Sequence, residues 1–265
     1  MLGMLFRGNK VAMNLDLLLK AYAHGIFPMA DSREDRDSFW VEPKTRAILP
    51  LDGIHISKSL AKTIKQDRFI VTTDSSFAAV IQACAQSTED RQETWINSDI
   101  EAAFCELHRM GMAHSIECWS DGQLVGGLYG LAMGRAFFGE SMFSRATDAS
   151  KVALAWLVAR MRVGNFTLLD CQFMTDHLQS LGAIEVSQRQ YLTLLEAALS
   201  RDQVSTVASS APPASSAAGA GAGAAASGGD WGSLDDLLAG VSVSGSSSAA
   251  SSPGKLILHS LTQIS

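Results

Sequence analysis

The chain has 265 residues, of which 47% are hydrophobic and 18% are charged, a composition typical of a globular enzyme with one large or two modest domains. Its net charge of −6 argues against a protein that coats nucleic acid without specificity, because binding along phosphates requires a cationic face. A local basic patch is still compatible with that charge.

Targeting segments and metal motifs are not found in the sequence. The first ten residues, MLGMLFRGNK, lack an extended apolar stretch and a cleavage site, and no later run approaches about 18 uninterrupted apolar residues. We therefore expect a cytoplasmic protein. The histidine and cysteine spacings match no zinc or disulfide pattern, and the GAGAG at 219–223 lacks the Lys-Ser/Thr of a phosphate loop. No cofactor and no metal are expected, and the thiols should be reduced at Cys84, Cys105, Cys118 and Cys171.

In chain order, apolar spacing and turn residues predict two runs of elements. The first half should hold helices at 12–23, 57–66, 76–85 and 100–110, a strand at 69–73 and a loop-rich stretch at 30–50. The second half should hold strands at 114–119, 123–131, 135–138, 166–171 and 184–186, a buried helix at 150–161, and helices at 177–181 and 191–199. Antiparallel strands followed by a buried helix, a strand and a short helix indicate an α+β fold.

The C-terminal part of the chain changes composition. From Ala208 to Gly229 every residue is Ala, Gly, Ser or Pro, which predicts disorder over 201–254 because such a segment cannot bury enough apolar surface. Inside it, the apolar spacing from Trp231 to Leu238 suits a short amphipathic helix, either transient or docked on a partner. Residues 255–265 contain the run Leu256-Ile257-Leu258, which predicts an edge strand.

Two polar motifs interrupt the apolar strands of the second half. In Leu168-Leu169-Asp170-Cys171-Gln172, strand alternation places Asp170 and Gln172 on one face and Leu169 and Cys171 on the other. A carboxylate beside an amide can orient an amine and assist removal of its proton, although the same pair could cap a loop or a helix. Glu140 follows another apolar strand and is either solvated there or held for a cation.

Aromatic and basic residues outside the predicted core suggest contacts with nucleic acid. Trp40 and Trp95 lie in polar surroundings, where each could stack on a base or anchor the core. Ser150 and Lys151 open the buried helix, whose N-terminus favours an anion, with capping by Ser150 as the alternative. One face of the helix at 57–66 and the residue just beyond it carry a cluster that is either a solvated face or a phosphate contact: Lys58, Lys62, Lys65 and Arg68.

Eight short motifs follow one another between residue 21 and about residue 195. They are Ala21-Tyr22 with Gly25-Ile26-Phe27-Pro28, Thr94-Trp95-Ile96, His114-Ser115-Ile116-Glu117, Gly126-Gly127-Leu128-Tyr129-Gly130, Gly139-Glu140-Ser141-Met142-Phe143-Ser144, Ala149-Ser150-Lys151, Asp170-Cys171-Gln172, and Asp176-His177 with Ser180-Leu181-Gly182-Ala183. Each is weak alone, but the ordered set is specific. With these motifs the chain resembles the leucyl/phenylalanyl-tRNA-protein transferase family.

The resemblance implies a fold and an activity. The fold would be a GNAT-like (N-acetyltransferase-like) catalytic domain at 99–200, preceded by a smaller α/β domain at 1–98 that contacts tRNA. The activity would move Leu or Phe, and less well Met, from aminoacyl-tRNA to the α-amine of proteins with N-terminal Arg or Lys. That addition would mark them for degradation by the N-end rule pathway. The enzyme would act as a monomer without a membrane partner.

The resemblance also implies roles for individual residues. Asp170 and Gln172 match the family's catalytic pair, thought to orient and activate the attacking amine, and Glu140 matches an acidic residue near the acceptor's basic side chain. Trp40 and Trp95 match aromatics that hold the terminal adenosine. Positions around the donor's side chain are all apolar here, as an apolar pocket requires: Leu128, Met142, Leu154, Leu157 and Leu169. Cys171 would be a neighbour and not a nucleophile.

The chain departs from the family pattern at Met29, since in the family an aromatic residue follows the Phe-Pro pair. It also departs in its Ala/Gly/Ser-rich tail. Three rival activities share parts of the pattern. An acyl-CoA-dependent N-acetyltransferase would need a Q/RxxGxG/A loop, which the sequence at 145–149 does not fit. A peptidoglycan-building aminoacyltransferase is usually longer and often has a coiled-coil arm, and a non-catalytic tRNA or N-terminus binding module would belong to a different class.

Overall fold

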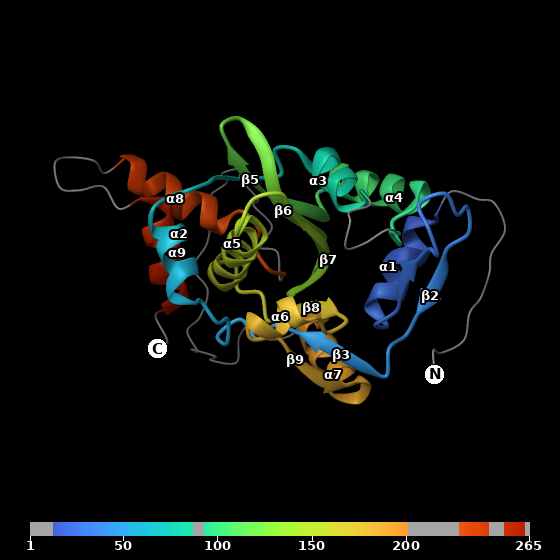
Figure 1. Ribbon diagram of the computed structural model, residues 1–265. Helices are drawn as coiled ribbons and strands as arrows, with labels where there is room; N and C mark the ends of the chain where they lie inside the picture. Colours follow the sequence, from blue (N-terminus) through green and yellow to red (C-terminus); the bar gives the residue numbers. More distant parts are fainter. Residues whose placement is uncertain (1–12, 87–92, 201–227, 244–251, 263–265) are drawn as a thin grey trace, which may run out of the picture.

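The computed structural model describes residues 13–86, 93–200, 228–243 and 252–262. A seven-stranded sheet with the order β4-β5-β6-β7-β8-β3-β9 forms its centre, and helices cover both faces (Figure 1). Its strands are β3 (Thr45–Ile48), β4 (Ile70–Thr73), β5 (Ala113–Ser120), β6 (Gln123–Met133), β7 (Ala136–Ser144), β8 (Leu168–Gln172) and β9 (Ile184–Ser187). A separate two-stranded sheet pairs β1 (Phe27–Met29) with β2 (Phe39–Val41).

Two apolar clusters lie on opposite faces of the large sheet. One contains buried residues of α2 (Lys58–Lys65), α5 (Ala149–Val163), α6 (Asp176–Ser180), α8 (Ser233–Val243) and α9 (Pro253–Thr262). The other contains buried residues of α1 (Leu15–Ala23), α3 (Phe77–Cys84), α4 (Ser98–Arg109) and α7 (Gln188–Leu199). The predicted α+β class is confirmed.

The expected GNAT-like order of elements is present around α5. Strands β5, β6 and β7 are antiparallel, α5 follows, and β8 then returns parallel to β7. Helix α5 packs closely on the sheet because β6 carries glycine at the contact: a Cβ on Gly126 would lie 2.5 Å from the Cβ of Ala149. The predicted burial of this helix is confirmed, since its residues from Ala149 to Met161 are almost all buried.

Local sequence signals explain where several elements begin. The side chain of Asn14 accepts a hydrogen bond from the Leu17 N–H at the start of α1, and Ser57 accepts one from the Leu60 N–H at the start of α2. Between β5 and β6, Asp121 and Gly122 have φ of 51° and 73°, the left-handed pair that a two-residue hairpin turn requires. The helices predicted in these two regions and the strands predicted at 114–119 and 123–131 are confirmed.

Other predictions were wrong. The stretch at 30–50 contains β2 and β3, and β7 continues past residue 138 to Ser144. Residues 255–262 do not form a strand but most of α9, in which Ile257 and Leu261 are buried four residues apart. That spacing is typical of a helix, whereas three consecutive apolar residues at 256–258 are compatible with both a helix and a strand.

The predicted disorder at 201–254 is wrong for its described part. Residues 233–243 form α8, and Leu234 at its start is buried in the cluster with α5. Residues 201–227 and 244–251, which complete the predicted segment, lie outside the described residues.

The large sheet also crosses the boundary expected at residue 98. Strands β3 and β4 precede that residue, yet β3 pairs with β8 and β9, and β4 pairs with β5. A division of the chain at 98 therefore does not follow the sheet. Within the described ranges, no helix has the length and apolar character needed to cross a membrane.

Candidate active site

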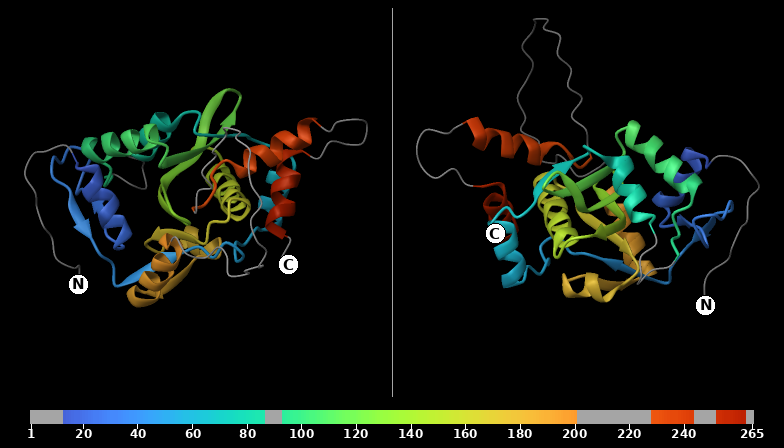
Figure 2. Two further views of the ribbon diagram at one scale, coloured as in Figure 1. Left: turned by 180° about the vertical axis from the view of Figure 1, so that it is seen from behind. Right: turned by 45° about the horizontal axis from the view of Figure 1, so that its top comes forward.

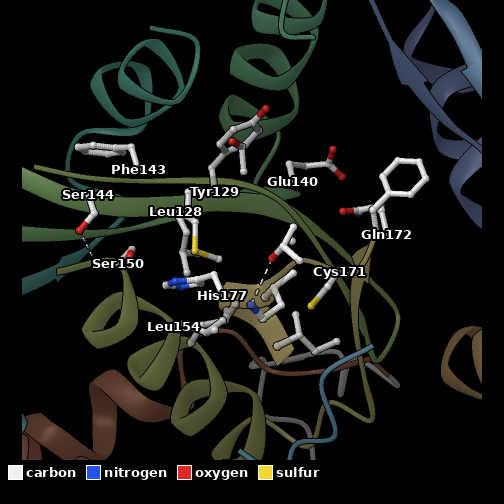
Figure 3. Close-up of a pocket in the computed structure, with 18 of the residues that line it drawn as sticks. Leu128, Tyr129, Glu140, Phe143, Ser144, Ser150, Leu154, Cys171, Gln172 and His177 are labelled. Atoms are coloured by element: carbon white, nitrogen blue, oxygen red, sulfur yellow. Dashed lines mark hydrogen bonds between the residues drawn. The ribbon is translucent and has the colours of Figure 1, made fainter. Parts of the chain in front are cut away.

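A cavity of about 1100 Å³ opens where β7 and β8 part (Figure 3). The two parallel strands are paired from Ala136–Leu168 to Phe138–Asp170, after which β7 continues to Ser144. The start of α5 and residues 172–178 close the opening. This gap in the sheet is where side chains from both faces can meet.

The wall of the cavity is largely apolar. All five residues predicted to surround the donor's side chain line it: Leu128, Met142, Leu154, Leu157 and Leu169. They come from β6, β7, α5 and β8, so the structure brings together positions that are up to 41 residues apart, from 128 to 169. Such a wall favours an apolar group over a polar one.

Asp170 does not line the cavity and is fully buried behind it. Its Oδ1 accepts hydrogen bonds from Arg46 Nε and the Gln172 N–H, each at 2.9 Å. Its Oδ2 accepts from Arg46 Nη2 at 2.6 Å and from the Tyr191 hydroxyl at 2.8 Å. With four donors around it, the carboxylate is fixed in place, and its acceptor sites are used by the protein itself.

Arg46 supplies the charge that makes this burial possible. Its side chain is 1% exposed, donates to the Gly25 carbonyl at 2.8 Å, and lies 4.7 Å and 4.3 Å from the ring centroids of Phe27 and Tyr191. Burial lowers the pKa of Arg46, but the charge and hydrogen bonds of Asp170, together with Tyr191 and Tyr22, raise it above the ordinary value. The Arg46 guanidinium is therefore charged.

Gln172 faces the cavity instead. The alternation of β8 turns Leu169 and Cys171 to the cavity and Asp170 away from it, as predicted, but the expectation that Gln172 shares the face of Asp170 is wrong. At Gln172 the backbone has φ of 58°, which breaks the alternation and leaves its side chain in the cavity lining as well. Its Nε2 is buried without a hydrogen-bond partner. That amide is available to a ligand.

Glu140 lies near Gln172 at the same end of the cavity (Figure 3). Its carboxylate accepts a hydrogen bond of 2.7 Å from the Tyr22 hydroxyl. Burial raises the pKa of Glu140 to about 8, although the Tyr22 hydrogen bond acts in the opposite direction. A cation placed in the cavity would favour its ionised form.

His177 and Tyr129 complete the polar lining. Tyr129 Oη and His177 Nε2, like Gln172 Nε2, are buried without a hydrogen-bond partner. Burial lowers the pKa of His177, and the charge of Lys151 lowers it further, so its imidazole is neutral at neutral pH. In the described residues, five buried side-chain nitrogen or oxygen atoms lack a hydrogen-bond partner, and three of them belong to side chains that line the cavity. This pattern indicates a polar ligand.

The thiol of Cys171 is chemically unsuited to act as a nucleophile. Burial raises its pKa, and the Asp170 charge raises it further, so the thiol is protonated at neutral pH. No group of three or more His, Cys, Asp or Glu side chains within the described ranges could hold a metal ion.

Of the two aromatic residues predicted to hold adenosine, one lines the cavity. Trp95 lines the cavity, whereas Trp40 does not and lies in β2 opposite Pro28. Met29, on the neighbouring strand, lines the cavity. The structure therefore places Met29 and Trp95, and not Trp40 and Trp95, at the cavity.

The remaining predicted residues lie at different distances from the cavity. Ser150 lines it and donates its N–H to Ser144 Oγ at 3.3 Å, but it is not the cap of α5, which begins after Asp148. Lys151 lies outside the lining, 3.7 Å from Asp148 Oδ1. The basic cluster is exposed on and just beyond α2 and does not line the cavity: Lys58, Lys62, Lys65 and Arg68.

Four residues of the site were not singled out from the sequence: Arg46, Tyr191, Tyr22 and His177. Arg46 and Tyr191 lie 124 and 21 residues from Asp170 along the chain, so no local spacing connects them with it. Tyr22 and His177 are inside quoted motifs, but no local pattern separates them from the other polar residues of those motifs. Their roles depend on contacts that only the folded chain provides.

Comparison with known proteins identifies the family. The family model described as leucyl/phenylalanyl-tRNA protein transferase matches residues 48–196, and the model of that family's N-terminal domain matches residues 13–44. The chain belongs to this family. The expected enzyme class, an aminoacyltransferase, is thereby confirmed.

Two relatives carry the name leucyl/phenylalanyl-tRNA–protein transferase. The one from Zymomonas mobilis is 65% identical over 184 residues, which cover 69% of each chain. The one from Novosphingobium aromaticivorans is 51% identical over 253 residues, 94% of this chain and 96% of the relative.

Two solved structures were also matched. A ribosomal-protein-alanine N-acetyltransferase from Brucella melitensis biovar Abortus 2308 has a TM-score of 0.30 and 14% identity over 58% of this chain and 99% of that one. L-PGS from Bacillus licheniformis has a TM-score of 0.35 and 11% identity over 62% of this chain and 55% of that one.

Proposed function

We propose that this transferase moves Leu or Phe, and less well Met, from aminoacyl-tRNA to the α-amine of proteins that begin with Arg or Lys. The observation that carries the proposal is a single cavity with an apolar wall and with Gln172 and Glu140 at one end. The wall suits the donor's side chain and Glu140 suits a cationic acceptor. Both substrates can therefore meet in one cavity.

On the donor side, the aminoacyl group occupies the apolar wall, and Trp95 and Met29 hold the terminal adenosine. Stacking on Trp95 would contribute about 1–3 kcal/mol. The N-terminus of α5, with Ser150 in the lining and Lys151 beside it, suits a phosphate. We assign further phosphate contacts to the basic cluster of α2, in the part of the chain before residue 98.

On the acceptor side, Glu140 pairs with the side chain of the N-terminal Arg or Lys. In the free site its pKa of about 8 leaves it largely protonated at neutral pH. An incoming guanidinium or ammonium stabilises the carboxylate, so binding releases a proton. The Tyr22 hydroxyl supplies one hydrogen bond to the carboxylate and the acceptor supplies another.

The reaction is aminolysis of an ester that is already activated. The α-amine attacks the carbonyl carbon, an amide bond forms, the ester C–O bond breaks, and the amine's proton ends on the ribose oxygen that leaves. The Gln172 amide donates to the carbonyl oxygen, on which negative charge develops. Asp170 does not touch the reacting atoms: through the Gln172 N–H it fixes the turn that aims the amide.

The transfer has a consequence for the acceptor protein. An added Leu or Phe replaces a cationic N-terminus with an apolar one, and we propose that this change marks the protein for degradation by the N-end rule pathway. In this proposal the enzyme is a monomer and takes part in the pathway in the cytoplasm.

The test is transfer in a purified system. The protein is incubated with Leu-tRNA or Phe-tRNA, labelled in the amino acid, and with peptides that begin with Arg, Lys or Ala. We expect label on the Arg and Lys peptides only. The Gln172→Ala variant should fold as the wild type and transfer about 10²-fold more slowly.

Two results would contradict the proposal. No transfer while the tRNA stays charged would exclude the activity. Equal transfer to the Ala peptide would exclude Glu140 as the acceptor site, and acetylation of the same peptides from acetyl-CoA would favour the N-acetyltransferase alternative.

A further inference from the structure

The described C-terminal residues, 228–243 and 252–262, pack on the catalytic core and are called here the C-terminal clamp. They lie outside both matched family segments, 13–44 and 48–196. Helices α8 and α9 run beside α5, and α9 also contacts α2 (Figure 2). Leu234, Ile257 and Leu261 of the clamp are buried in the same apolar cluster as α5.

Trp231 is held in a site made by β5, β7 and the turn after β4. Its ring stacks on His114 and Phe137, with centroid distances of 4.2 Å and 5.3 Å. Its Nε1–H donates to Asp74 Oδ2 at 3.0 Å, and His114 Nδ1 lies 2.8 Å from the same oxygen. The Trp231 ring has aromatic partners and its Nε1–H has a carboxylate acceptor, so the contact is specific.

Arg160 makes α5 depend on the clamp. This arginine is 1% exposed, and its Nη1 and Nη2 donate to the two carboxylate oxygens of Asp235 at 2.7 Å and 2.5 Å. Nη1 also donates to the Trp231 carbonyl. In the described part of the chain, Asp235 is the only carboxylate within ion-pair distance of Arg160. Loss of the Asp235 charge while the clamp stays bound would leave a buried charge on α5 without its counter-ion, which is strongly unfavourable.

Backbone N–H groups anchor the start of each of the two clamp segments. The Gly229 N–H donates to the Gly134 carbonyl at 2.7 Å and the Asp230 N–H to the Gly164 carbonyl at 2.8 Å. At the start of α9, the Gly254 N–H donates to Asp67 Oδ1 at 2.7 Å, just beyond α2. The clamp therefore joins the end of α5 to the end of α2.

Helix α5 is also a wall of the active-site cavity, through Ser150, Leu154 and Leu157. We propose that the clamp, bound in cis by its own chain, fixes α5 and α2 and so sets the affinity of the cavity for the aminoacyl donor. The effect on the affinity for the aminoacyl donor rests on the proposed function. The effect of the clamp on α5 and α2 does not depend on that function.

The first experiment compares Trp231→Ala and Asp235→Asn with the matched control Asp236→Asn, an exposed neighbour on α8. Amide hydrogen exchange in α5 and α2 should become about tenfold or more faster in the two clamp variants and stay unchanged in the control. The KM for aminoacyl-tRNA should rise several-fold in the clamp variants, with kcat within about twofold of the wild type. Asp235→Asn keeps the Trp231 site and so remains measurable if Trp231→Ala does not fold.

The second experiment inserts a protease site between Ala208 and Ser227 of the full chain and cuts the purified protein. The two pieces should elute together and keep the uncut KM, whereas the cut Trp231→Ala protein should separate. Release of the segment from the cut wild type would overturn the proposal. So would unchanged exchange and unchanged KM in both clamp variants. Exchange and co-elution need no substrate, so they stand even if the wild type shows no transfer.

Discussion

At the scale of single residues, Asp170 and Gln172 differ in what their side chains can bind. Asp170 is surrounded by four donors from Arg46, Tyr191 and Gln172, while the Gln172 amide has a free Nε2 in the cavity. A carboxylate so fully bonded has its acceptor sites filled by the protein. In the proposed reaction, its effect passes through the backbone of Gln172.

A double-mutant cycle tests this arrangement. Arg46→Met leaves the buried Asp170 without its counter-charge and should lower the free energy of unfolding by about 3–5 kcal/mol. Arg46→Met combined with Asp170→Leu should recover part of that stability, because two apolar groups replace the pair while the Gly25 carbonyl, the Gln172 N–H and the Tyr191 hydroxyl lose a partner. Urea unfolding measures the stability and the transfer assay measures kcat.

The double variant separates the two roles of the pair. It should remain well below wild-type kcat, since the Gln172 N–H no longer has its acceptor. If the recovered stability came with fully recovered kcat, the pair would be structural only.

Glu140 gives the site a pH dependence. Its folded pKa of about 8 lies above the ordinary 4.5, so between these values the folded state holds a proton that the unfolded state releases. Stability from this group is complete below pH 4.5 and is lost as pH rises toward 8. The slope approaches about 1.4 kcal/mol per pH unit.

Glu140→Gln provides the comparison, because the amide does not titrate. The difference in unfolding free energy between wild type and variant should change steadily from about pH 5 to about pH 8, with the wild type losing stability relative to the variant. Parallel curves over that range would show that Glu140 has an ordinary pKa.

At the scale of elements, α2 carries charge outward and apolar residues inward. Leu60 and Ile64 are buried against α5 and α9, while the three lysines are exposed. This separation of faces agrees with the predicted spacing. It leaves the ammonium groups free to meet phosphates without disturbing the core.

Replacing Lys58, Lys62 and Lys65 together by Gln should weaken tRNA binding and reduce the slope of log K against log salt by about one for each phosphate that is no longer neutralised. Unfolding should change little because the side chains are exposed. The control replaces Lys20, Arg109 and Arg189, which are also exposed, by Gln. An equal effect in both triple variants would indicate a general charge effect and no site on α2.

At the scale of the whole molecule, local patterns predicted much of the fold. Most helices, the β5–β6 hairpin and the five apolar cavity residues follow from apolar periodicity, turn residues and the family motifs. Arg46 could not be found in this way, because it lies on β3, which pairs with both β8 and β9. The run from Trp231 to Leu238 was predicted as a short amphipathic helix, but Trp231 precedes α8, and its binding site is assembled from residues near 74, 114, 137 and 160.

The insertion of β3 between β8 and β9 also determines when the cavity can form during synthesis. Residues 45–48 leave the ribosome early, yet their partners extend to Ser187. Contacts of such long sequence separation slow folding, because the intervening chain must be closed into a loop. The pairing of β3 with both neighbours, which holds Arg46 beside Asp170 and so aims Gln172, is therefore completed only after more than two-thirds of the polypeptide has been made.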